Sequence, residues 1–360
     1  MSKKAKFLLI IIILLLVVAG VLLIIHFSTE KNAEMLYNKI YERFRLGSPS
    51  DIKIAIEKFR YLASRYPDSK YARKALFRIG NGYELLYKLT DDPDKLDIAQ
   101  REYFFLVKRY PHSLEAQKAL LRIAHIDYIR GYYEDAIDRL NYLLERYPAT
   151  PLKAKIYTEK GWNYLSLGNF KFAIANFTKP ENANQPEALL GKAEAYFKLG
   201  EVDRAISIYE ELIHYRKATV IWKRSKERFL KLTYKYARSL SRNGEYERAN
   251  RYFLKIVQLF PDTTLAENSL FWIGENYYDL KLYNKAIEFY EKVKANNIYS
   301  RDDVATFKIG ICYFEQKDFV KALEYFNQFL CMYPDSPYKD LVEKWKEQTL
   351  REIKYRNIAY

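Results

Sequence analysis

Residues 309–334 read IGICYFEQKDFVKALEYFNQFLCMYP. Gly310 provides a small residue where two antiparallel helices can approach closely, and apolar residues recur around it at helical spacing. Ala322 and Phe326, four residues apart, lie on one face of a second helix. Pro334 ends that helix, because proline cannot continue it. The segment therefore predicts a helical hairpin with one apolar face that needs a neighbour.

The same pattern recurs along the chain with a period of about 37 residues, which is typical of helical repeats. The small residue and the aromatic or leucine four places later occur at Ala55/Phe59, Ala99/Tyr103, Ala136/Leu140, Ala173/Phe177, Ala205/Tyr209, Ala249/Phe253, Ala286/Tyr290 and Ala322/Phe326. Stacked hairpins bury a continuous core that one hairpin cannot form alone. Eight aligned copies favour an all-α solenoid over an irregular helical bundle.

This pattern resembles the tetratricopeptide repeat (TPR) from Leu36 to about Ser336, although the first unit lacks a good match to the first helix of the repeat. The joints Tyr66-Pro67-Asp68-Ser69, Tyr110-Pro111-His112-Ser113 and Tyr333-Pro334-Asp335-Ser336 are similar to those of bacterial envelope TPR proteins of the BamD/CpoB type. That resemblance implies work outside the cytoplasmic membrane. The chain departs from those proteins because it has more repeats and no lipoprotein cysteine after its apolar segment.

The N-terminal segment 7–25 reads FLLIIIILLLVVAGVLLII. At about 1.5 Å per residue it is long enough to span the hydrocarbon core of a membrane. Its length and the lack of a small-x-small cleavage site favour an uncleaved signal anchor over a cleaved signal peptide. Lys3, Lys4 and Lys6 precede the span, which predicts that the N-terminus stays in the cytoplasm. The expected location is therefore the bacterial inner membrane, with a single span and the C-terminal domain in the periplasm.

The expected organisation follows from these features. We expect a cytoplasmic tail at 1–6, a transmembrane anchor at 7–27, a linker at 28–34, the repeat array at 35–336 and a capping helix with a tail at 337–360. The fourth unit is cut short at Thr178-Lys179-Pro180, which suggests a bend near residue 180.

The formal net charge is +15, from 60 basic and 45 acidic residues. The charges are mixed along the chain without a long basic block, which favours a solvated surface; contact with acidic partners or anionic lipid is the alternative. Nucleic-acid binding is not expected of a periplasmic domain. Cys312 and Cys331 have no metal-type spacing and fall on apolar helix faces, so we expect free buried thiols, with a disulfide between them as the alternative.

Catalytic motifs are missing from the sequence. The four histidines are scattered, and no metal-binding, phosphate-binding or nucleophile motif occurs. We therefore expect no enzyme activity, no metal and no cofactor.

The resemblance to TPR proteins places the binding surface on the inner, first helix of each hairpin. The groove positions are Phe77, Asn81, Leu121, His125, Tyr128, Trp162, Leu165, Leu190, Phe197, Tyr234, Arg238, Phe271, Tyr278, Phe307 and Phe314. This aromatic set predicts an apolar helix or extended peptide of a partner protein. The alternative is that the rings only pack between helices.

The expected function is a membrane-anchored scaffold that helps to assemble a cell-envelope complex. A structural subunit of a collar-type periplasmic flagellar assembly is an alternative, as is a receptor module for peptide or peptidoglycan.

Overall fold

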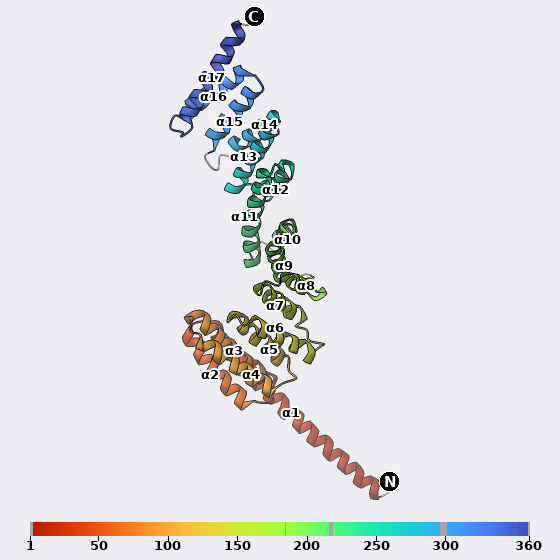
Figure 1. Cartoon of the computed structure of the whole chain (residues 1–360). Helices are drawn as coiled ribbons and strands as arrows, with labels where there is room; N and C mark the ends of the chain where they lie inside the picture. The colour runs from red at the N-terminus through yellow and green to blue at the C-terminus, as the bar shows by residue number, and fades with distance from the viewer. Residues whose placement is uncertain (1–2, 184, 216–218, 296–300, 359–360) are drawn as a thin grey trace. The chain divides into compact units, whose positions relative to one another are not determined.

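The computed structural model describes residues 3–183, 185–215, 219–295 and 301–358, and every regular element in these ranges is a helix (Figure 1). The chain forms two compact units, Met1–Leu199 and Gly200–Tyr360. The helices of the first unit are α1 (Lys3–Arg45), α2 (Pro49–Arg65), α3 (Lys70–Thr90), α4 (Asp94–Arg109), α5 (Leu114–Ile129), α6 (Tyr133–Arg146), α7 (Lys153–Ser166), α8 (Phe170–Phe177), the short 3-10 helix η1 (Pro180–Asn182) and α9 (Pro186–Leu199).

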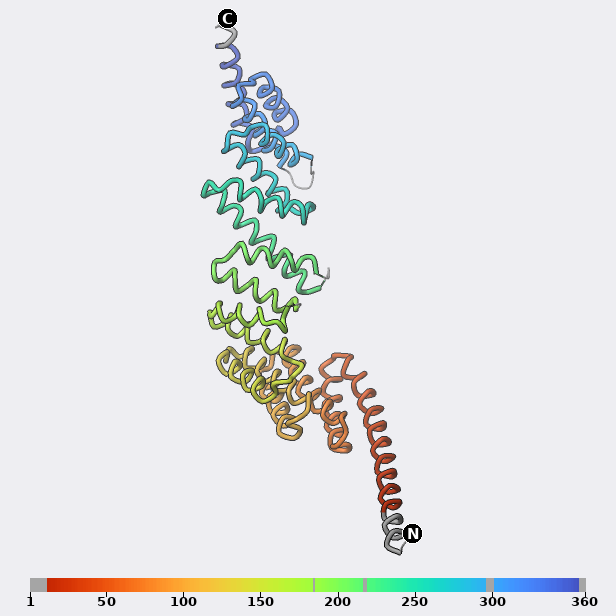
Figure 2. The backbone as a smooth tube through the Cα atoms, turned by 90° about the vertical axis from the view of Figure 1, so that its right-hand side faces the viewer, coloured from red at the N-terminus to blue at the C-terminus, as the bar shows by residue number. Residues whose placement is uncertain are grey.

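The second unit continues the same pattern. Its helices are α10 (Val202–His214), α11 (Val220–Arg242), α12 (Tyr246–Leu259), α13 (Thr264–Asp279), α14 (Tyr283–Ala295), α15 (Asp302–Glu315), α16 (Phe319–Met332) and α17 (Lys339–Ile358). Within each unit, successive helices run antiparallel and pack side by side (Figure 2). The predicted all-α, TPR-like solenoid architecture is confirmed.

In several hairpins an aromatic ring of the second helix lies over a glycine of the first helix. A Cβ added to Gly310 would lie 2.6 Å from Cε1 of Phe326, and one added to Gly274 would lie 2.6 Å from Cε1 of Tyr290. These distances are below van der Waals contact, so only glycine allows the second helix to pack this closely. The rings of Phe326 and Tyr290 are fully buried. The small residues of the sequence pattern thus set the spacing between the two helices of a hairpin.

The turns between paired helices need a left-handed residue. Gly131 fills this position between α5 and α6 with φ at +82°, which glycine adopts without strain. Lys317 occupies the corresponding position between α15 and α16 with φ at +63°. A sequence search for glycine alone misses this turn, because Lys317 takes the same conformation and its backbone amide donates to the Phe314 carbonyl as that of Gly131 donates to Tyr128.

Helix α1 is continuous from Lys3 to Arg45, so the segment 28–34 that we expected to be a linker is helical. Its part from Ile12 is long and apolar enough to cross a membrane. Its C-terminal part buries Ala33, Tyr37, Ile40 and Phe44 against the following helices. The same helix therefore supplies the first half of the first hairpin, which the sequence pattern matched poorly.

Near Pro180 the chain forms η1 after the short helix α8, whereas the division into two units falls later, at Leu199. Phe177 packs against two glycines, with its Cε1 2.5 Å from a Cβ added to Gly161 or to Gly191. This double contact joins α7, α8 and α9 across the shortened hairpin. A bend at this point stays a prediction.

At the other end of the array, α17 packs against the last hairpin. Val342 is buried, and Trp345 meets Phe314 edge to face with ring centroids 5.1 Å apart. Leu341 and Leu350 are exposed. Both cysteines are free, as predicted, and Cys312 is buried. The predicted burial of Cys331 is wrong, because its side of α16 is exposed. Burial raises the pKa of the Cys312 thiol to about 12, which keeps it neutral and unreactive near neutral pH.

Replacing Gly310 with Ala is expected to lower the free energy of unfolding by about 1–3 kcal/mol, the usual cost of overpacking a tight core. The added methyl group forces the Phe326 ring to move, because this ring has no free space. Urea denaturation followed by circular dichroism measures the effect. Phe326→Leu provides the matched partner, since the cost of Gly310→Ala should be smaller in that background; equal costs in both backgrounds would contradict the proposed contact.

Candidate functional site

The fifteen predicted groove residues lie on the first helices of their hairpins, from α3 to α15. None of them is exposed. Leu121, Leu190, Phe271 and Phe307 are buried, and the other eleven are half-buried. They lie in two separate units, so the structure does not bring all of them into one described site.

Most of the predicted aromatic rings are part of the packing between paired helices. The ring pairs, with their centroid distances, are Phe77–Tyr103 at 5.6 Å, Trp162–Phe177 at 5.5 Å, Tyr234–Phe253 at 5.8 Å, Phe271–Tyr290 at 5.7 Å and Phe307–Phe326 at 6.1 Å. Each first-helix ring contacts the ring on the second helix of its own hairpin. These residues therefore form the floor of the inner face and contribute little open apolar surface.

A pocket of about 510 Å³ opens on the inner face of the first unit, and we call it the inner pocket. Phe77, Leu121 and Leu152 give it an apolar floor. Its polar and small lining residues are Lys118, Arg122, Ala154, Lys155, Thr158, Glu159, Gln185 and Glu187. The volume lies within the range of ordinary ligand pockets.

The sequence prediction included two residues of the inner pocket, Phe77 and Leu121, and missed its charged rim. Lys118 lies three residues before Leu121 on α5, so the two residues share a helix face. This spacing was a usable signal for Lys118. For Lys155 on α7 no comparable signal exists, because its place beside α5 depends on how the two hairpins stack.

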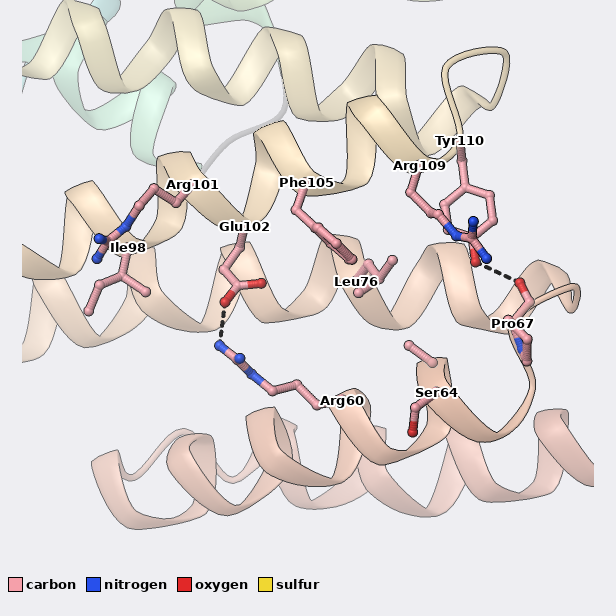
Figure 3. A pocket seen from close by; sticks show the side chains of 11 residues that line it. Arg60, Ser64, Pro67, Leu76, Ile98, Arg101, Glu102, Phe105, Arg109 and Tyr110 are labelled. Carbon is pink, nitrogen blue, oxygen red and sulfur yellow. Dashed lines mark hydrogen bonds and ion pairs between the residues drawn. The ribbon is translucent and has the colours of Figure 1, made fainter.

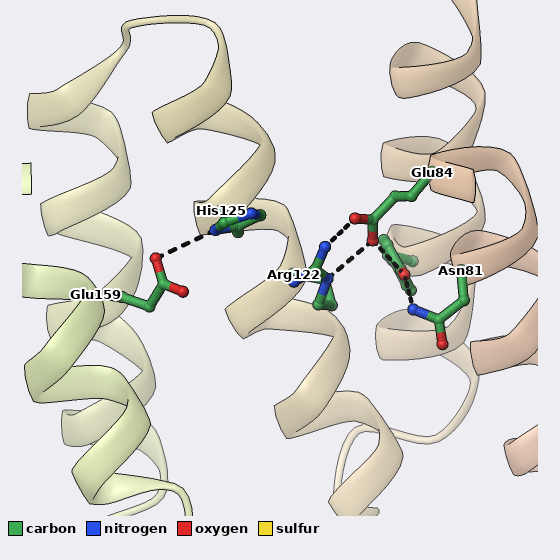
Figure 4. Close-up of polar contacts among 6 residues, drawn as sticks. Asn81, Glu84, Arg122, His125 and Glu159 are labelled. Atoms are coloured by element: carbon green, nitrogen blue, oxygen red, sulfur yellow. Dashed lines mark hydrogen bonds and ion pairs between the residues drawn. The ribbon is translucent and has the colours of Figure 1, made fainter. Parts of the chain in front are cut away.

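A buried polar network fixes the helices beside the inner pocket (Figure 4). The hydroxyl of Tyr103 donates to Glu84 Oε1 at 2.6 Å and accepts from the Asn81 amide at 2.9 Å. Arg122 donates to the same carboxylate through Nε at 2.9 Å and through a terminal nitrogen. The network joins α3, α4 and α5, so Asn81 has a structural role on the inner face.

The pKa values of Tyr103 and Arg122 in this network both lie above their ordinary values. Burial of the Tyr103 hydroxyl raises its pKa well above the ordinary value, and the Glu84 charge raises it further. Burial alone would lower the pKa of Arg122, but the hydrogen bond and charge of Glu84 outweigh it and raise that pKa. Both groups keep their ordinary protonation state near neutral pH, and the network serves to position helices.

His125 and Glu159 connect the next two hairpins. His125 Nδ1 lies 3.2 Å from Glu159 Oε2, and its ring stacks on Tyr128 with centroids 6.1 Å apart. Both partners of the pair are half-buried. The predicted groove residue His125 is therefore engaged with α7 beside the inner pocket.

The inner face of the second unit has a smaller, basic hollow of about 320 Å³ along α11. Its lining residues are Tyr234, Lys235, Arg238, Ser239 and Arg242. The Arg238 guanidinium lies 3.5 Å from the centre of the Trp272 ring, a close cation–π contact. The hollow thus presents two further cations, Lys235 and Arg242.

The predicted groove residues of α13 and α15 also sit in packed surroundings. Glu275 accepts hydrogen bonds from the Tyr290 hydroxyl and, at 2.8 Å, from Lys308 Nζ. Lys308 lies over the Tyr278 ring at 5.5 Å. Burial raises the pKa of Tyr278 to about 12, so its hydroxyl stays neutral.

A larger groove of about 910 Å³ lies on the opposite side of the first unit, between α2 and α4, and we call it the outer groove (Figure 3). Leu76, Ile98 and Phe105 give it apolar walls. Arg60 pairs with Glu102 across it. Sequence reasoning did not identify this groove, because its walls come from α2, α3 and α4, which belong to two different hairpins.

Metal binding was not expected, and within the part of the chain that the structure describes no group of three or more His, Cys, Asp or Glu side chains is arranged to hold a metal ion.

Sequence comparison identifies four repeats. Family models described as "Tetratricopeptide repeat" match residues 187–216, 233–263 and 305–336, and a second such model matches 267–295. The chain therefore contains tetratricopeptide repeats, as the sequence pattern predicted. No curated protein sequence matches the chain. The narrower resemblance to envelope proteins of the BamD/CpoB type stays a prediction.

Several solved structures are similar. A tetratricopeptide repeat protein from Parabacteroides merdae is 19% identical, with a TM-score of 0.41, over 78% of this chain and 99% of that one. The Thermus thermophilus TPR protein TTC0263 is 20% identical, with a TM-score of 0.40, over 56% and 98%. Yeast Tom70 is 12% identical, with a TM-score of 0.37, over 86% and 60%.

Replacing Arg122 with Leu is expected to destabilise the first unit by about 2–4 kcal/mol, because Glu84 then stays buried without its cation. The double variant Glu84→Leu/Arg122→Leu should recover most of this loss, since no buried charge remains. Thermal unfolding of the single and double variants measures both effects. If the double variant lost as much stability as the sum of the two single variants, the pair would not be coupled.

Proposed function

We propose that this tetratricopeptide-repeat chain is a membrane-anchored scaffold that captures a segment of a partner protein in the inner pocket of its first unit. Tetratricopeptide repeats generally form non-enzymatic surfaces that bind other proteins. The inner pocket carries the proposal, because an apolar floor with a few convergent charges is the usual composition of a peptide site.

The charges on the rim refine the chemistry of the expected partner. Lys118 and Lys155 form no ion pair among the described residues, whereas Arg122 and Glu159 are held by Glu84 and His125. The two free cations favour a carboxylate, and the floor favours a large apolar side chain. We therefore expect a partner segment in which an acidic residue lies close to a Leu, Ile or Phe.

The anchor gives the scaffold its proposed location. Helix α1 is apolar over a length that suits a membrane, and Lys3, Lys4 and Lys6 precede its apolar segment. We propose that α1 crosses the bacterial inner membrane with the repeats in the periplasm. A scaffold in this location would recruit subunits of a cell-envelope complex, and a collar-type periplasmic flagellar assembly is one such complex.

A peptidoglycan-binding role has less support. Such a site would need free carboxylates beside aromatic rings, and Glu194 on α9 and Glu275 on α13 are the carboxylates to consider. Glu194 is buried, and Glu275 is held by Tyr290 and Lys308. Neither carboxylate is available to a sugar on the inner face.

In-cell photo-crosslinking tests the inner pocket. A photoreactive residue at Lys155 is expected to trap one partner protein, and Lys118→Glu in the same chain should reduce the adduct about tenfold or more, since it removes one ionic contact and adds a repulsive one. A photoreactive residue at exposed Lys171 on α8 is the matched control. Equal adducts at both positions, or an adduct insensitive to Lys118→Glu, would place the partner elsewhere.

Protease treatment of spheroplasts tests the topology. The repeats are expected to be digested when only the outer membrane is opened, because they would lie outside the inner membrane. Immunoblotting with an antibody to the C-terminal helix follows the digestion, and a cytoplasmic protein serves as the control for intact spheroplasts. Protection of the repeats until the inner membrane is lysed would reverse the proposed orientation.

A further inference from the structure

Two turns of the first unit form a basic edge next to the proposed membrane span. Residues 65–70 read RYPDSK and residues 108–113 read KRYPHS. We call these two segments the turn edge. The hydroxyl of Tyr110 donates to the carbonyl oxygen of Pro67 at 2.6 Å, so the two turns lie against each other, at the labelled Pro67 and Tyr110 of Figure 3.

Helix α1 holds the turn edge directly. Glu30 accepts hydrogen bonds from the backbone amide of Lys70 at 3.0 Å and from the Ser69 hydroxyl at 3.1 Å. One helical turn later, Glu34 accepts from the Tyr71 hydroxyl at 2.5 Å. The turn edge is therefore fixed at the level of Glu30 on the helix that leads into the proposed span.

The depth of this level follows from helix geometry. Glu30 lies three residues beyond Phe27, the last residue of the expected anchor 7–27, which is about 4.5 Å along the helix axis. The lipid headgroups extend about 5–7 Å beyond the hydrocarbon core on each side. With α1 across the membrane, the turn edge lies within the headgroup layer.

The charges of the turn edge suit this environment. Arg65, Lys70, Lys108 and Arg109 are all exposed, and none forms an ion pair within the described residues. Asp68 is the single acidic residue in the two segments. The side chains of Arg65 and Arg109 lie over the rings of Tyr66 and Tyr110, and tyrosine is enriched at membrane interfaces.

We propose that the turn edge is a docking surface for the headgroups of anionic phospholipids in the membrane that α1 spans. This inference rests on the proposed anchoring. It assigns to these residues a contact separate from the inner pocket, whose lining shares no residue with the turn edge. The contact would fix the orientation of the first unit relative to the membrane, and it would weaken as ionic strength rises.

A fluorescent probe on the turn edge tests the proposal in the full chain. The probe is attached to Ser64→Cys, at the exposed end of α2, in a chain that also carries Cys331→Ser. Cys312 stays unlabelled because it is buried. The chain is reconstituted in nanodiscs of phosphatidylcholine and phosphatidylglycerol, in which one of the two lipids bears a nitroxide quencher near the glycerol backbone.

Quenching by labelled phosphatidylglycerol is expected to exceed quenching by labelled phosphatidylcholine, and salt should reduce the difference. Each charge removed should weaken the preference, by up to about fivefold where the cation is fully engaged. The test variant carries glutamine at Arg65, Lys70, Lys108 and Arg109. The matched control carries glutamine at four exposed lysines at the opposite ends of the helices, Lys53, Lys88, Lys171 and Lys198.

The preference should disappear in the test variant and persist in the control. Equal quenching by the two lipids in the unmodified chain, or a preference that survives in the test variant, would overturn the docking surface while anchoring stands. Failure of the unmodified chain to insert would instead overturn the proposed anchoring, and the docking inference with it. Circular dichroism confirms that both variants keep their helices.

Discussion

The contact of an aromatic ring with a glycine is the constraint on which the repeats depend. At Gly161, Gly274 and Gly310 the ring of the following helix occupies the space of the missing side chain. This contact fixes how closely paired helices approach, and the stacking of hairpins follows from that spacing. The rings that contact these glycines also contact the half-buried rings of the inner face. Phe177, for example, lies over Gly161 and packs edge to face against Trp162.

Much of the fold was predictable because the ring of this contact belongs to a short sequence pattern, an alanine followed four residues later by an aromatic residue. The pairs Ala286/Tyr290 and Ala322/Phe326 marked the second helices at the correct places. The first helix of the first hairpin was harder to recognise, since Tyr37 and Phe44 lie on the same continuous helix as the apolar segment. A linker was expected there because a change from apolar to polar composition does not show where a helix ends.

The candidate site was less predictable, for a physical reason. The sequence placed Phe77 and Leu121 on the inner face, but their exposure depends on the ring of Tyr103 and on neighbouring hairpins. The pairing of Glu84 with Arg122 joins residues of different repeats, and no local spacing encodes it. The charged rim of the inner pocket could therefore be identified only from the structure, in which the hairpins that supply it are stacked.

The continuity of α1 has a consequence for assembly in the plane of a membrane. A flexible seven-residue linker has an end-to-end distance of roughly 15 Å, so the first unit could change its position relative to the membrane by about that much. A helix over residues 28–34 removes that freedom. In a bilayer, the inner pocket of every copy would therefore lie at the same distance from the membrane surface. Partners held in the same membrane would then meet the pocket in a thin layer, where their effective concentration is far higher than in solution. Weak individual contacts can build an ordered assembly under that condition.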